Sequence, residues 1–103
     1  MEKKILLVDD EPVILETYSA LLSEKGFSVV TASSGREALK TFSGNSFDLV
    51  ITDLAMPDGD GFKLLEEIKE ISPHTPVIVF TGKIYRPVKD FVALLGANYL
   101  IEK

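Results

Sequence analysis

The chain has 103 residues, of which 46% are hydrophobic, so it can form one domain with one core but not two. Its 16 acidic and 11 basic residues give a net charge of −5, which argues against a nucleic-acid binder, since such a protein needs a basic face. Cysteine is absent and histidine occurs once, which excludes disulfides, thiolate metal sites and multi-histidine metal sites. No apolar run approaches the roughly 20 residues of a membrane span. We therefore expect a cytoplasmic protein with no nucleic-acid or membrane partner.

The first third of the chain predicts a strand, a helix and a second strand. Lys4–Val8 is apolar without alternation, which is typical of a strand buried on both faces. Val13–Lys25 follows Pro12, carries one apolar stripe and stops at Gly26, which predicts an amphipathic helix. The stripe consists of Ile14, Tyr18, Leu21 and Leu22. Phe27–Ala32 predicts the second strand.

The middle of the chain repeats this alternation. Ser34 and Glu37 match a capping box and open a short helix that Gly44 closes. Leu49–Thr52 is an apolar run that predicts a third strand. A loop rich in proline, glycine and aspartate follows, and a helix is expected over Gly61–Ile71.

The last third predicts two more strands around one helix. Val77–Phe80 is an apolar strand, and apolar residues at helical spacing indicate a helix over Pro87–Leu95. Tyr99–Ile101 predicts a short fifth strand. Strands that alternate with helices imply a doubly wound α/β fold, with a parallel sheet, right-handed crossovers and helices on both faces. Such folds bind ligands beyond the carboxyl ends of their strands.

Polar residues follow four of the five predicted strands. Asp9 and Asp10 follow the first, Asp53 the third, Thr81 the fourth and Lys103 the fifth. Each residue alone is commonplace, because aspartates often cap turns or begin helices and a terminal lysine is usually solvated. Parallel strands end at one edge of their sheet, so we expect all five side chains to meet in one shallow site.

Three neighbouring carboxylates repel one another, and Mg²⁺ prefers carboxylates, carbonyls and water as its ligands. A bound Mg²⁺ would hold a phosphoryl oxygen against Asp53, with Lys103 and Thr81 contacting the other phosphoryl oxygens. Asp53 needs no general base, because it attacks as a carboxylate. The strand ends therefore predict that Asp53 accepts a phosphoryl group.

Four blocks of the sequence resemble the receiver domain of two-component response regulators. They are LLVDDEP at 6–12, ITDLAMPDGDG at 51–61, VIVFTG at 77–82 and GANYLIEK at 96–103. Asp53 follows Asp10 by 43 residues, Thr81 follows by 28 more and Lys103 by a further 22, as in that family. The resemblance covers residues 1–103 as one receiver domain and implies a flavodoxin-like five-stranded sheet of order 2-1-3-4-5.

The resemblance also implies a role for each site residue. Asp53 would be the phosphoacceptor, and its donor would be a phosphohistidine of a sensor histidine kinase or of a histidine phosphotransfer protein. The Mg²⁺ ligands would be Asp10 directly, Asp9 mainly through water, Asp53 itself and the backbone carbonyl of Ala55. Thr81 would be the switch hydroxyl and Lys103 the family's lysine. Ala55 and Lys83 lie where the family tunes hydrolysis of the acyl phosphate.

The sequence departs from the family in two places. The family's switch aromatic lies three residues before the lysine, where this chain has Leu100, with Tyr99 beside it. The family also continues with a proline and a fifth helix, whereas this sequence stops at Lys103. We therefore expect an exposed apolar strip, on the order of several hundred Å², beside the first helix. Such a strip implies either a fragment or self-association.

Three alternative functions share parts of this sequence pattern. A phosphatase of the haloacid dehalogenase type needs a second acid two residues after its aspartate, where this chain has Ala55. A flavodoxin-like cofactor binder needs a phosphate loop rich in serine, threonine and glycine after the first strand, where this chain has Asp9, Asp10 and Glu11. The third alternative, a receiver-like interaction or dimerisation module without productive phosphorylation, stays open.

Overall fold

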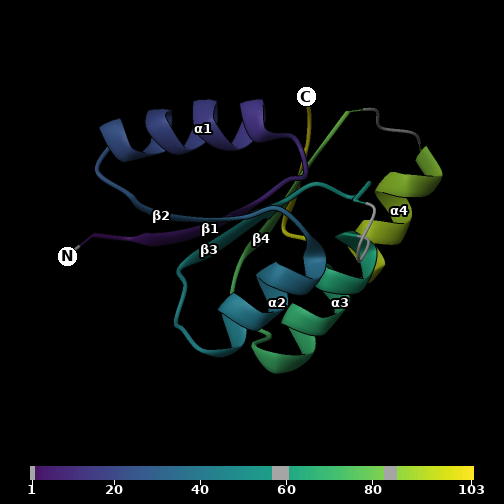
Figure 1. Cartoon of the computed structure of the whole chain (residues 1–103). Helices are drawn as coiled ribbons and strands as arrows, with labels where there is room; N and C mark the ends of the chain where they lie inside the picture. The colour runs from purple at the N-terminus through teal and green to yellow at the C-terminus, as the bar shows by residue number, and fades with distance from the viewer. Residues whose placement is uncertain (1, 57–60, 83–85) are drawn as a thin grey trace.

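In the computed structural model, which describes residues 2–56, 61–82 and 86–103, five parallel strands form one sheet with four helices packed against it (Figure 1). The strands are β1 (Lys4–Val8), β2 (Ser28–Ala32), β3 (Leu49–Thr52), β4 (Val77–Thr81) and β5 (Tyr99–Glu102). The helices are α1 (Pro12–Glu24), α2 (Gly35–Ser43), α3 (Gly61–Ile71) and α4 (Arg86–Leu94). The strand order is β2-β1-β3-β4-β5, and every pair is parallel. The predicted flavodoxin-like order is therefore confirmed.

The predicted elements all form, with small shifts at their ends. Pro12 occupies the first position of α1, as its type predicts, while the helix ends at Glu24, one residue earlier than predicted, before Gly26 with φ +95°. Helix α4 also lies one residue earlier than predicted, and β4 and β5 each extend by one residue. In the capping box, the Ser34 hydroxyl accepts from the Glu37 N–H at 3.1 Å, while the Glu37 carboxylate accepts from Ser33. Proline and capping residues in the sequence therefore predict where α1 and α2 begin.

The hydrophobic core lies between the sheet and three of the four helices. Helices α2, α3 and α4 lie on one side of the sheet, whereas α1 lies alone on the other (Figure 1). Phe42 of α2, Leu65 and Ile68 of α3 and Val92 of α4 are buried against strand residues such as Val50. Helix α1, in contrast, contains no buried residue. The two faces of the sheet are therefore covered unequally.

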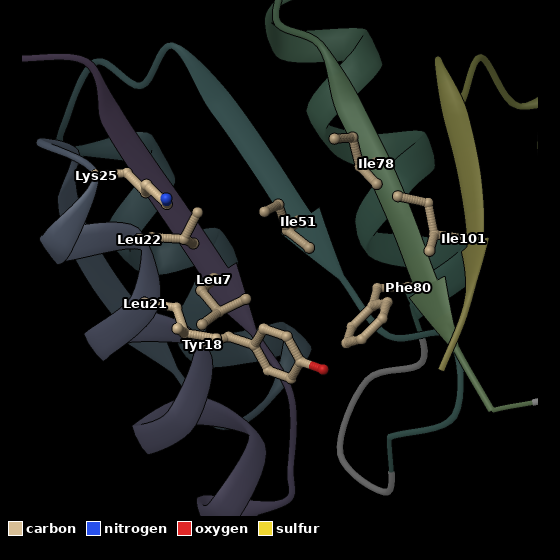
Figure 2. A pocket seen from close by; sticks show the side chains of 9 residues that line it. All are labelled: Leu7, Tyr18, Leu21, Leu22, Lys25, Ile51, Ile78, Phe80 and Ile101. Atoms are coloured by element: carbon tan, nitrogen blue, oxygen red, sulfur yellow. The ribbon is translucent and has the colours of Figure 1, made fainter.

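The face beside α1 opens into an apolar pocket of about 450 Å³ (Figure 2). Its lining consists of Tyr18, Leu21 and Leu22 from α1, Lys25 directly after α1, and Leu7, Ile51, Ile78, Phe80 and Ile101 from the strands. Tyr18 and Phe80 meet edge to face, with ring centroids 5.2 Å apart. Tyr18 is 37% exposed and Leu21 47%, although both belong to the predicted apolar stripe. The expected apolar strip beside the first helix is therefore present, and the described part of the chain holds no fifth helix to cover it.

The register of the sheet brings the carboxyl ends of four strands to one edge. Val8 pairs with Thr52, and Thr81 pairs with Glu102. The parallel ladder continues one residue beyond the strands, because Asp53 N–H donates to Val8 at 3.1 Å and Lys103 N–H donates to Thr81 at 2.7 Å. Backbone hydrogen bonds therefore fix the residues that follow these strands before any side-chain contact is considered.

Candidate functional site

Three carboxylates meet at the carboxyl edge of the sheet. Asp9 and Asp10 follow β1, Asp53 follows β3, and one oxygen from each lies within 4.8 Å of the others. Asp9 is only 1% exposed and Asp53 5%, whereas Asp10 faces solvent. Repulsion between carboxylates this close is relieved by a divalent cation, and an all-carboxylate donor set suits Mg²⁺. The three carboxylates predicted as metal ligands thus come together, and their chemistry fits that ion.

The Lys103 ammonium lies between the two buried carboxylates. Its Nζ atom is 2.7 Å from Asp9 Oδ2, 3.1 Å from Asp53 Oδ2 and 3.4 Å from Glu11 Oε1. The lysine side chain is 15% exposed, and its Nζ also lies 5.8 Å from the centre of the Phe80 ring. The lysine predicted at the site is therefore its central cation.

The pKa of Lys103 reflects these contacts. Burial by itself lowers the pKa of this ammonium, but the hydrogen bonds and charges of Asp9 and Asp53 outweigh burial and raise the pKa above its ordinary value. Lys103 therefore stays charged wherever the carboxylates are ionised and offers a fixed positive charge to an anion that enters the site.

Backbone N–H groups orient the Asp53 carboxylate. Its Oδ1 atom accepts from Leu54 N–H at 2.7 Å and from Ala55 N–H at 3.4 Å, while Oδ2 lies beside Lys103. The Thr52 hydroxyl donates to the backbone carbonyl of Asp53 at 2.9 Å. Each oxygen of the carboxylate thus has its own partner, so the side chain is held in one orientation at the end of β3.

The other predicted residues lie near the site with fewer contacts. Thr81 is buried at the end of β4, and its backbone carbonyl accepts from Lys103, but no hydrogen bond joins its hydroxyl to the carboxylates among the described residues. Leu100 packs partly buried against the core, while Tyr99 is exposed. Lys83 lies outside the residues that the structure describes. The backbone carbonyl of Ala55 stays a predicted ligand.

Glu11 was not predicted as a site residue, yet it belongs to the cluster. Its N–H donates to Asp9 Oδ1 at 2.9 Å, and its carboxylate pairs with Lys103. The run of three acids after β1 was the available signal. It did not reveal that the backbone of the third acid would fix the first, because that contact depends on the turn that leads into α1.

A doubly wound parallel sheet with an acidic cluster and a lysine at its carboxyl edge defines a flavodoxin-like domain with a candidate cation and phosphate site. The family model of the response regulator receiver domain matches residues 5–103. The chain belongs to that family.

Individual relatives agree with this assignment. The chain is 46% identical over 89 residues to the transcriptional regulatory protein GlrR of Escherichia coli, and the match covers 86% of this chain and 20% of GlrR. This chain thus spans about a fifth of the length of GlrR. The chemotaxis protein CheY4 of Vibrio cholerae superposes with a TM-score of 0.96 at 31% identity, over 100% of this chain and 88% of that one. The response regulator TrrA of Thermotoga maritima, solved in complex with Mg²⁺–BeF, superposes with a TM-score of 0.88 at 36% identity. The superposition covers 98% of this chain and 86% of TrrA.

Removing the Lys103 charge tests its role in the cluster. We expect Lys103→Met to lower the free energy of unfolding by about 1–3 kcal/mol, because two buried carboxylates lose their cation. The pKa of Lys103 is raised in the folded state, so its stabilisation is complete below about pH 10.5 and is lost as pH rises through the folded-state value. Urea denaturation at pH 7 and above pH 10.5 measures both effects.

The matched control for this experiment is Lys63→Met. Lys63 is 72% exposed in a surface pair with Glu67, so its removal should change stability by no more than about 0.5 kcal/mol. Equal losses of stability in the two variants, or a Lys103→Met deficit as large above pH 10.5 as at pH 7, would contradict the proposed ion cluster.

Proposed function

We propose that this receiver domain accepts a phosphoryl group on Asp53 and thereby alters its contacts with other proteins. The observation that carries the proposal is the convergence of Asp9, Asp10, Asp53 and Lys103 at one edge of the sheet. A carboxylate held by backbone N–H groups, beside an ammonium, suits in-line attack on phosphorus. The family of the chain supports the same function.

The transfer uses the residues as the structure holds them. Asp53 attacks phosphorus, a P–O bond forms to its carboxylate, and the bond to the leaving nitrogen of a phosphohistidine breaks with its electron pair. The Lys103 ammonium beside Asp53 Oδ2 binds a phosphoryl oxygen and offsets its charge. The Thr81 hydroxyl is proposed to contact another phosphoryl oxygen. We infer that the donor belongs to a sensor histidine kinase or a histidine phosphotransfer protein.

Mg²⁺ is the proposed cofactor. Asp10, as the exposed member of the cluster, would bind it directly, Asp9 mainly through water, and Asp53 and the Ala55 carbonyl would complete the protein ligands. When bound, the ion supplies positive charge that draws a phosphoryl oxygen towards Asp53. Lys103 already contacts Asp9 and Asp53, so its ammonium and the Mg²⁺ ion would together balance the negative charge of these carboxylates.

The apolar pocket beside α1 supports a second proposal, self-association. Its lining is apolar apart from Lys25, and Tyr18, Leu21 and Ile101 expose large apolar surfaces at its rim. A parallel α/β sheet is ordinarily covered on both faces. Two copies that meet through this face would cover both pockets with one self-complementary contact. This contact would serve the alternative function, an interaction or dimerisation module, whether or not Asp53 is phosphorylated.

Incubation with acetyl phosphate and Mg²⁺ tests the phosphoacceptor. We expect the intact mass to rise by one phosphoryl group in the unmodified chain and not in Asp53→Asn, because the amide oxygen is a poor nucleophile. Asp90→Asn, an exposed acid on α4, is the control and should gain the same mass as the unmodified chain. A gain that persists in Asp53→Asn, or no gain at all, would contradict the proposal.

Thermal unfolding with Mg²⁺ tests the cofactor. An ion that binds only the folded state raises the melting temperature by mass action, by an amount that grows with ion concentration. We expect this rise in the unmodified chain and its loss in Asp10→Asn, while Asp90→Asn keeps it. If Asp10→Asn shows the full rise, the ion binds elsewhere.

Sedimentation velocity across a range of concentrations tests self-association. We expect the sedimentation coefficient of the unmodified chain to increase with concentration and that of Leu21→Lys to stay at the monomer value, because a charge at the pocket opposes its burial. Leu94→Lys is the control, since Leu94 is 84% exposed on α4, on the opposite side of the sheet. A well-folded unmodified chain that remains monomeric would refute self-association.

A further inference from the structure

The backbone around Asp53 is fixed by hydrogen bonds on both sides of the residue. The Asp53 carbonyl accepts from the Thr52 hydroxyl at 2.9 Å, and the next carbonyl, that of Leu54, accepts from Gly61 N–H at 2.8 Å. Leu54 N–H in turn donates to Asp53 Oδ1 at 2.7 Å. Leu54 therefore links the two parts, because its N–H orients the Asp53 carboxylate and its carbonyl accepts from the first residue of α3.

Gly61 has no room for a side chain at this contact. A Cβ atom there would collide with the Asp53 carbonyl oxygen and would lie 2.6 Å from Leu54 Cα and 2.8 Å from the Asp53 carbonyl carbon. These neighbours are backbone atoms and cannot turn aside as the end of a flexible side chain can. Gly61 is thus required for space at this contact.

Helix α3 cannot easily move away to make that room. Leu64, Leu65 and Ile68 on its inner side are at most 3% exposed and pack in the core. Ordinary contact begins near 3.4 Å, so a Cβ at residue 61 needs the two backbones to separate by more than half an ångström. Because the core is close-packed, much of this shift falls on the Asp53–Leu54 peptide.

We propose that Gly61 is a positioning residue, which sets where the Asp53 carboxylate stands relative to Asp9 and Lys103. The close approach of α3 holds the Leu54 peptide, and that peptide holds Asp53 Oδ1. Displacement of a reacting group by about 1 Å can slow a reaction by about 10²-fold. The consequence for phosphoryl transfer rests on the proposed phosphoacceptor function, whereas the steric coupling does not.

The test compares Gly61→Ala with Gly44→Ala. Gly44 ends α2, has φ −96° and has nothing within 4 Å of its Cβ position, so it controls for the substitution itself. We expect the acetyl phosphate reaction of folded Gly61→Ala to be about 10- to 100-fold slower, and that of Gly44→Ala to be unchanged. We also expect the amide NMR signals of Leu54 and Ala55 to shift and the exchange protection of the Leu54 N–H to fall in Gly61→Ala alone.

A second pair of variants keeps the test decisive if Gly61→Ala fails to fold. Thr52→Val removes the hydroxyl that holds the Asp53 carbonyl at nearly constant volume, while Thr52→Ser keeps it, so the serine variant should retain more of the rate. The positioning role would be overturned if Thr52→Val and Thr52→Ser reacted with acetyl phosphate at equal rates. It would also be overturned if a folded Gly61→Ala variant kept the original rate and amide signals. If the unmodified chain gains no phosphoryl group but the Leu54 amide still shifts in Gly61→Ala, the proposed function fails and the positioning contact stands.

Discussion

The cluster in which the Lys103 ammonium contacts Asp9 and Asp53 is the interaction on which the arrangement of the site depends. Two carboxylates that are almost fully buried would repel each other strongly without a cation beside them. The lysine that supplies this charge lies 50 residues beyond Asp53, at the end of the last strand, so the ion pairs join β1, β3 and β5. The site can therefore form only when the sheet is complete as far as β5.

The same cluster also fixes the orientation of the Asp53 carboxylate. Asp53 has one oxygen held by backbone N–H groups and one beside an ammonium, so its orientation is fixed in the folded chain. Fixed charges and dipoles of this kind are effective because they need no reorganisation when charge develops. The close contact of Gly61 with the Asp53 backbone extends this arrangement from the site into α3 and the hydrophobic core.

The two faces of the sheet are covered to different extents. Helices α2, α3 and α4 bury the core on one face, whereas α1 alone leaves Tyr18, Leu21 and Ile101 exposed on the other. Phe80 belongs to both regions, because its ring lines the pocket, meets Tyr18 and lies near Lys103 Nζ. The pocket beside α1 and the acidic site are thus adjacent, with the Phe80 ring between them.

The amino-acid sequence by itself determined the alternation of strands and helices, the approximate ends of each element and the residue types at the strand ends. Those features depend on local periodicity, capping residues and prolines, which act over a few residues. It also predicted the convergence of Asp9, Asp10, Asp53 and Lys103, because parallel strands share one carboxyl edge.

Only the tertiary structure decided which contacts these residues make. The pairing of Glu11 with Lys103, the exposure of Tyr18 and Leu21 within an apolar stripe, and the lack of space at Gly61 depend on distances between segments far apart in the chain. Periodicity shows which side of a helix is apolar, but not whether a neighbour covers it. A glycine in a sequence likewise does not show whether it serves a turn or a close approach, since only packing distinguishes the two.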